Sequence, residues 1–166
     1  SHGQLVTLQT QGFLPPRGSS PRSGRIDLLQ RRGSGGHFPQ STKGERVCFV
    51  SYLLRGVRFP IHPFLQGLLE YYSLQLHNLT PASVVHIAGF AALCELFLGC
   101  EAHFDLWRKL FYLVPRNREG SIFEVGGAEV WRIAGTGYLS GTPKKALEEW
   151  PSEWFYIEDV ALPDLV

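Results

Sequence analysis

The sequence predicts a mainly helical α+β fold. Three apolar segments with helical periodicity follow one another over about 62–76, 81–98 and 102–113. Behind them, alternating β-branched and aromatic residues predict a β-hairpin over about 121–133. Helices and antiparallel strands in separate stretches of the chain are typical of the α+β class.

Composition divides the 166 residues into three parts. A short N-terminal segment, 1–14, precedes a stretch rich in Gly, Ser and Arg at 15–44. This stretch has too few apolar residues to offset its ordering entropy, so we expect a disordered linker. Residues 45–166 contain all four tryptophans and form the predicted folded domain. Their number is enough for one domain of ordinary size.

The middle helical segment has local start and stop signals. Thr80 is a suitable N-cap, Pro81 stands at the first helical position, and Gly99 follows the last apolar residue. Between them the segment is apolar nearly all round, and such a helix requires cover on every side. We therefore expect 81–98 to be a buried core helix.

The neighbouring segments are the expected cover for this helix. One face of 62–76 is apolar at helical spacing, with Leu65, Leu68, Leu69, Tyr72 and Leu76. One face of 102–113 is aromatic and apolar, with Phe104, Trp107, Leu110 and Phe111. Short links between the segments favour three packed helices.

Strand signals occur at both ends of the folded domain. Residues 45–52 (ERVCFVSY) are rich in β-branched and aromatic residues and favour a short strand. The pair Gly126-Gly127 suits the tight turn of the predicted hairpin. A further C-terminal strand is predicted at 153–159.

Cysteine usage and apolar patterning bear on the compartment. Cys48, Cys94 and Cys100 lack the paired spacing of a secreted disulfide framework, which favours an intracellular protein, with nucleus and cytoplasm both open. No signal-peptide pattern is visible at the N-terminus. His86 and Glu95 lie inside the most apolar segment, which disfavours a transmembrane helix and a membrane partner.

The sequence contains no recognisable catalytic or metal-binding pattern. The two matching pairs of closely spaced ligands that a tetrahedral metal site needs, a nucleophile elbow and a phosphate-binding loop are all missing. We therefore predict no enzyme activity, no catalytic residue, no cofactor, no metal and no small-molecule substrate. Cys94 is interpreted as a small hydrophobe of the core. Glu95 is interpreted as a buried carboxylate paired with a nearby Arg or His.

Charge is unevenly distributed along the chain. Residues 1–44 contain six Lys or Arg and one Asp, for a net charge of +5, whereas 45–166 contain ten basic and fourteen acidic residues, for −4. A basic arm can contact nucleic-acid phosphates without reading bases. The candidate contacts are Arg22, Arg25, Arg31 and Arg32. A solvated linker has the same composition, so both interpretations stay open.

Several runs of residues together resemble a known family. They are RFPIHPFLQGLLEYYSLQLHNLTPASVVHIAGFAALCELFLG, HFDLWRKLF, FEVGGAEVW and EEWPSEWFYIEDV, in this order. The combination closely resembles the domain called "transposase (putative) gypsy type", which occurs in plant proteins derived from long-terminal-repeat retrotransposons. The resemblance covers 45–166, with a weaker likeness at 12–17 (GFLPPR). Residues 18–40 depart from the family pattern, as in a degenerate copy.

The resemblance implies an origin in a retrotransposon and leaves the chemistry open. The family has no assigned catalytic residues, so none is transferred to this chain. A non-catalytic, gag-like structural module that self-associates is the function most consistent with a mainly helical body. The alternative is a nucleic-acid-binding accessory protein of the element. A divergent metal-dependent transposase or nuclease is the third hypothesis, and it requires DNA cleavage that Glu95→Gln abolishes.

Nucleic-acid binding by the arm is tested by deleting residues 15–44. Loss of the arginines is expected to weaken binding and to lower its salt dependence, by about 0.7 to 0.9 in the logarithmic slope per lost phosphate contact. Fluorescence anisotropy with a labelled oligonucleotide across a salt series measures both quantities. A Gly/Ser segment of the same length is the matched control, since it keeps the spacing without the charge. Binding that survives the deletion unchanged contradicts this role.

Overall fold

The computed structural model describes residue 10 and residues 45–117, 119–136, 150–152 and 154–158. The chain forms two compact units, which are described separately. The first unit comprises Ser1–His62 with Glu149–Val166, and the second comprises Pro63–Glu148. The predicted linker at 15–44 and its boundary near residue 44 lie outside the described residues.

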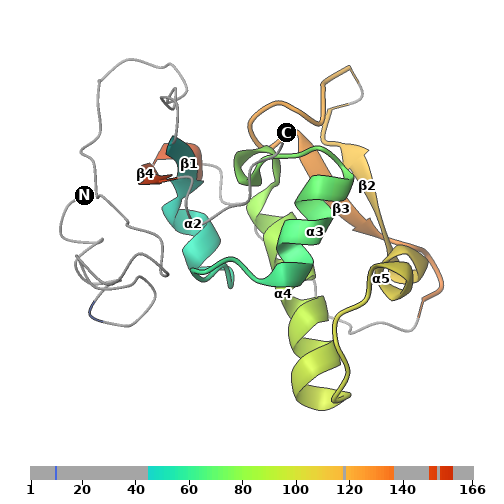
Figure 1. The fold of residues 1–166 in the computed structure, drawn as a ribbon. Coiled ribbons are helices and arrows are strands. Elements are labelled where there is room, and N and C mark those ends of the chain that lie inside the picture. The colour runs from blue at the N-terminus through green and yellow to red at the C-terminus, as the bar shows by residue number, and fades with distance from the viewer. Residues whose placement is uncertain (1–9, 11–44, 118, 137–149, 153, 159–166) are drawn as a thin grey trace. The chain divides into compact units, whose positions relative to one another are not determined.

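The first unit contains a two-stranded antiparallel sheet (Figure 1). Strand β1 (Glu45–Phe49) pairs with β4 (Trp154–Glu158), and Val47 lies opposite Tyr156 in the register. The strands predicted at 45–52 and 153–159 are both present. The first of them is shorter than expected, because helix α2 (Val50–Leu53) begins directly after Phe49.

Aromatic rings pack together where strand β1 passes into helix α2. Tyr52 in α2 and Trp150 in the 3₁₀ turn η3 (Trp150–Ser152) stack with ring centroids 5.7 Å apart. The Phe49 ring meets both edge-on, at 5.4 Å from Tyr52 and 4.8 Å from Trp150. Phe49 and Tyr52 are completely buried, so this cluster is the core of the described part of the first unit.

The second unit is built around helix α4 (Pro81–Ala92), which continues into the π-helical turn η2 (Leu93–Phe97). Before it come α3 (Pro63–Tyr71) and the 3₁₀ turn η1 (Leu76–Asn78), and after it comes α5 (Phe104–Leu110). The antiparallel strands β2 (Phe111–Pro115) and β3 (Ala128–Arg132) complete the unit.

An aromatic cluster joins these helices and confirms the expected cover over the first part of the central segment. The Phe90 ring of α4 lies 5.1 Å from Phe64 of α3 and 5.3 Å from Trp107 of α5. Trp107 in turn stacks on Phe111 at 4.2 Å. Phe90, Trp107 and Phe111 are at most 1% exposed. The three predicted helices therefore do pack together.

The first helix ends earlier than predicted, at Tyr71 rather than 76. Ser73 adopts a left-handed conformation (φ 53°), and its N–H donates to the Glu70 carbonyl. The Leu74 N–H donates to the Leu69 carbonyl, which completes a Schellman motif and buries Leu74 entirely. Glycine normally takes the left-handed position, so the serine gave no stop signal in the sequence.

The third helix and the hairpin also differ from the prediction. The helix expected over 102–113 ends at Leu110, and Phe111–Pro115 is the first strand of the hairpin. The second strand, Ala128–Arg132, lies within the predicted 121–133, whereas residues 122–126 form turns and a bend. The hairpin loop is therefore much longer than a two-residue turn.

Two interactions explain why residues 121–126 do not form a strand. The Asn78 amide donates to the carbonyls of Phe123 (2.7 Å) and Glu124 (3.3 Å) and so holds this segment in its turns. A Cβ on Gly127 would collide with the Ser121 carbonyl oxygen. The Asn78 bonds join distant parts of the chain, and the Gly127 contact depends on how closely the loop packs. Neither can be recognised from a local sequence pattern.

The start of α4 is bonded to the free edge of β3. Thr80 caps the helix as predicted, with its hydroxyl accepting from the Ser83 N–H at 3.1 Å. The Ser83 hydroxyl accepts from the Val130 N–H at 2.9 Å and donates to the Ala128 carbonyl at 3.2 Å. The Thr80 N–H donates to the same carbonyl at 3.1 Å. Thr80 and Ser83 are both buried, so each of these bonds satisfies a polar group shielded from water.

Ser83→Ala is expected to lower the free energy of unfolding by about 1 to 3 kcal/mol, because it leaves the buried Val130 N–H without its partner. Urea unfolding measures the difference. Ser51→Ala is the matched control, since the Ser51 hydroxyl is buried in α2 and makes no hydrogen bond within the described structure. This variant is expected to be neutral or stabilising. If both substitutions change the free energy of unfolding equally, the hydrogen bonds assigned to Ser83 do not stabilise the fold.

Candidate interaction surface

Three consecutive apolar side chains are exposed where η2 ends. Leu96 is 78% exposed, Phe97 79% and Leu98 62%, and we call these three residues the apolar tip. In Figure 1 the yellow-green end of this helix extends beyond α3 within the second unit. The expectation that the whole segment 81–98 is buried is therefore wrong for its last turn. The reason is that α3, α5 and β3 cover only its first part.

The backbone of η2 sets the direction of these side chains. Cys94 is completely buried, whereas every residue from Glu95 to Glu101 is exposed. The Leu98 N–H donates to the Leu93 carbonyl at 3.1 Å, which is the wide i→i−5 turn of a π-helix. Gly99 then leaves the helix with a left-handed φ of 66°. The three apolar side chains therefore lie around the end of the helix and do not form a stripe along one of its faces.

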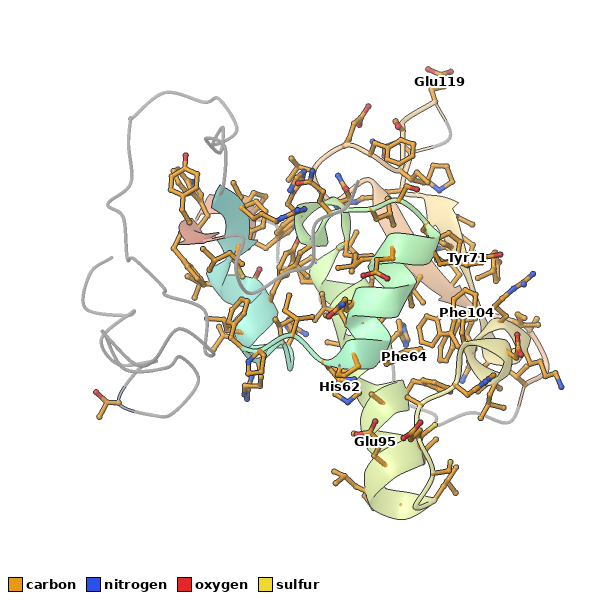
Figure 2. All side chains as sticks on the ribbon, in the orientation of Figure 1. His62, Phe64, Tyr71, Glu95, Phe104 and Glu119 are labelled. Atoms are coloured by element: carbon orange, nitrogen blue, oxygen red, sulfur yellow. The ribbon has the colours of Figure 1, made fainter. Side chains whose placement is uncertain are left out.

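Glu95 was predicted to be buried, and this prediction is wrong. Its side chain is exposed next to the apolar tip (Figure 2). Water solvates a carboxylate in such an exposed position, so its charge carries no burial cost there. Glu95 precedes the tip in the sequence, and Glu101, which follows it, is also exposed. The tip is therefore apolar with two acidic neighbours.

A second exposed surface in the same unit is aromatic and basic. The Tyr71 ring lies 4.4 Å from Phe104, and Tyr72 lies 5.0 Å from Tyr71 (Figure 2 labels Tyr71 and Phe104). The Arg108 guanidinium lies 6.0 Å from the centroids of both Tyr71 and Phe104. We call Tyr71, Tyr72, Phe104 and Arg108 the aromatic patch. Tyr71 is 58% exposed and Arg108 is also exposed, whereas Tyr72 and Phe104 are partly buried.

Electrostatics within the aromatic patch act on the Tyr72 hydroxyl. Burial raises its pKa above the ordinary value, Arg108 opposes this shift, and Tyr71 adds to it. Tyr72 therefore stays neutral at physiological pH, and Arg108 supplies the positive charge of the patch. Lys109 follows it on the exposed side of α5.

In the described part of the chain, histidines, cysteines and carboxylates do not gather into a set of three possible metal ligands. His86 is half-buried against the Phe111 ring, at 5.6 Å between centroids. Cys94 is buried, as predicted for a small hydrophobe, and Cys100 is exposed.

The predicted nucleic-acid contacts Arg22, Arg25, Arg31 and Arg32 lie outside the described residues. The described part of the chain has no helix long and apolar enough to cross a membrane. The apolar tip and the aromatic patch were not predicted as surfaces. A signal existed in the run Leu96-Phe97-Leu98-Gly99, because three apolar residues directly before a helix stop cannot all face one neighbour.

Part of the chain is similar to a known protein family. Residues 47–115 match the family model described as "putative gypsy type transposon". The match confirms the family resemblance over the segment from β1 to the end of β2, which contains the apolar tip and the aromatic patch. No curated protein and no solved structure matches the chain.

His86 is expected to titrate below its ordinary pKa of 6.5. Burial lowers this pKa first and the positive charge of Arg132 lowers it further, while Glu129 opposes them. Since the unfolded chain then binds the proton more tightly, the contribution of His86 to stability is present above pH 6.5 and is lost as the pH falls through the folded-state pKa. NMR titration of the ring measures the pKa. A value at or above 6.5 contradicts the expected environment.

Proposed function

We propose that the chain is a non-catalytic, gag-like module of a retrotransposon-derived protein, and that it self-associates. The exposed apolar tip is the observation that carries the proposal. Burying one Leu or Phe side chain is worth about 1.5 to 3 kcal/mol, so three adjacent ones form a strong anchor for association. The family match supports an origin in a transposable element.

A second copy of the chain is the partner that fits the tip. Glu95 and Glu101 give the surroundings of the tip a negative charge, and Arg108 with Lys109 gives the aromatic patch a positive one. The tip of one copy is therefore complementary to the patch of another in both polarity and charge. Contact between two different surfaces leaves a free tip and a free patch at the ends, so copies can continue to add. Such growth is what a coat-forming module requires.

A nucleic-acid-binding accessory role is the second candidate. It rests on the six basic residues against one acidic residue in 1–44. The two roles are compatible within one chain, because the basic residues and the apolar tip lie in different segments. Size-exclusion chromatography with and without nucleic acid distinguishes association that needs nucleic acid from association that does not.

Phe97→Glu is expected to weaken self-association by about tenfold to a hundredfold. The reason is that a carboxylate replaces an apolar side chain that the proposed interface between two copies would bury. Static light scattering over a concentration series measures the average mass. Leu54→Glu is the matched control, since Leu54 is 61% exposed in the first unit and lies in neither surface. A wild-type chain that stays monomeric throughout its soluble range contradicts the proposal.

Mixing two variants tests the pairing of tip with patch. Phe97→Glu keeps an intact patch, and Arg108→Glu keeps an intact tip, so each alone is expected to associate weakly. An equimolar mixture is expected to form dimers that do not grow further, because only one productive contact remains per pair. Mixtures that stay monomeric, when the wild type associates, contradict this pairing and leave self-association itself in place.

A further inference from the structure

Two cysteines meet at the base of the apolar tip. Cys94 and Cys100 are six positions apart in the sequence. The wide turn of η2 and the left-handed Gly99 fold the chain back, so that the Cys100 N–H donates to the Cys94 carbonyl at 3.0 Å. The backbones of the two cysteines are thus directly adjacent.

Their side chains are also close enough to affect each other. Burial raises the pKa of Cys94, and the neighbouring Cys100 thiol raises it further. A direct backbone hydrogen bond keeps the Cα atoms of two residues close together, and bridged cysteines have Cα separations of about 4.4 to 6.8 Å. The pair can therefore be bridged without a large movement of the backbone.

The two thiols differ in access to reagents. Cys94 has no exposed surface, whereas Cys100 is exposed. An external reagent therefore reacts first with Cys100. Cys94 is then the resolving thiol, which means that it attacks the mixed disulfide formed on Cys100. Cys48 is buried in the first unit, where its thiol lies 3.8 Å from the Phe49 carbonyl oxygen, and it takes no part in this pair.

We propose that Cys94 and Cys100 form a thiol–disulfide site that reacts with low-molecular-weight disulfides such as glutathione disulfide. The Cys100 thiolate attacks one sulfur of the reagent, and one glutathione thiolate leaves. The Cys94 thiolate then attacks the Cys100 sulfur of the mixed disulfide, which forms the internal bond and releases the second glutathione. Both cysteine protons pass to the released thiolates, and the two electrons lost by the protein reduce the reagent.

The second step depends on the ionisation of Cys94. Burial and the neighbouring Cys100 raise the pKa of Cys94, so little of its thiolate exists at neutral pH. Closure of the bond therefore accelerates with pH beyond the range in which an ordinary cysteine is already ionised. Once formed, the bond closes a ring through the apolar tip and holds the η2 turn in place.

The test uses the full chain, reduced and monomeric, in buffers of graded glutathione ratio. Trapping with iodoacetamide and peptide mass spectrometry then identify each cysteine. The expected product is the Cys94–Cys100 bond, favoured about tenfold or more over the same chain in urea, because folding raises the effective concentration of one thiol near the other. Cys48→Ser is the matched control and is expected to leave the bond unchanged.

Cys100→Ser is expected to leave Cys94 reduced and protected from iodoacetamide until the chain unfolds. Three results overturn the proposal. One is a stable mixed disulfide between Cys100 and glutathione as the end product. The others are a Cys100 bond between two copies in place of the internal bond, and an internal bond no more favourable in the folded chain than in urea.

Discussion

The second unit depends on a hydrogen-bonded contact between the first turn of α4 and the free edge of β3. Unpaired strand edges are costly to bury, and here the Val130 N–H and the Ala128 carbonyl face a helix rather than a third strand. Ser83 satisfies both groups with a single hydroxyl, and Thr80 adds a backbone bond to Ala128. The Thr80 hydroxyl also caps the helix by accepting from the Ser83 N–H, and it is hydrogen-bonded to the Ser83 hydroxyl. The hydrogen bonds that begin helix α4 and those that attach the hairpin to it therefore depend on the same two residues, Thr80 and Ser83.

Features governed by neighbours in the sequence were predictable, and features governed by distant residues were not. The start of α4 at Thr80 and Pro81 follows from capping alone, and the structure has it there. The end of α5 depends on pairing between Phe111 and Arg132, which no window of helical periodicity contains. The turns at 122–126 depend on Asn78, some 45 residues earlier. Phe111 illustrates the ambiguity, because it fits the helical face and also serves as a strand residue facing the core.

The candidate surface shows a second limit of sequence reasoning. An apolar helix was expected to be covered everywhere, and that holds for Phe90, which three aromatic rings surround. It fails for Phe97, because the neighbouring helices do not reach the last turn. Apolar character predicts the need for cover, but not whether the chain itself or a partner supplies it. For the same reason Glu95, expected to be buried with the helix, lies in solvent.

The π-helical turn connects the proposed association surface with the proposed thiol pair. Residues of a regular α-helix continue in register with the core, so a buried Cys94 would be followed by further buried positions at i+3 and i+4. Here Cys94 is the last buried residue of the helix, and the wider turn after it carries Phe97 and Leu98 beyond the neighbouring helices. It also lengthens the return path, which Gly99 then closes by bringing Cys100 beside Cys94. Because the tip residues contribute little to the core, their substitution leaves the aromatic cluster around Phe90 intact. Association and stability can therefore be changed independently, which is the condition for assigning a function to this surface.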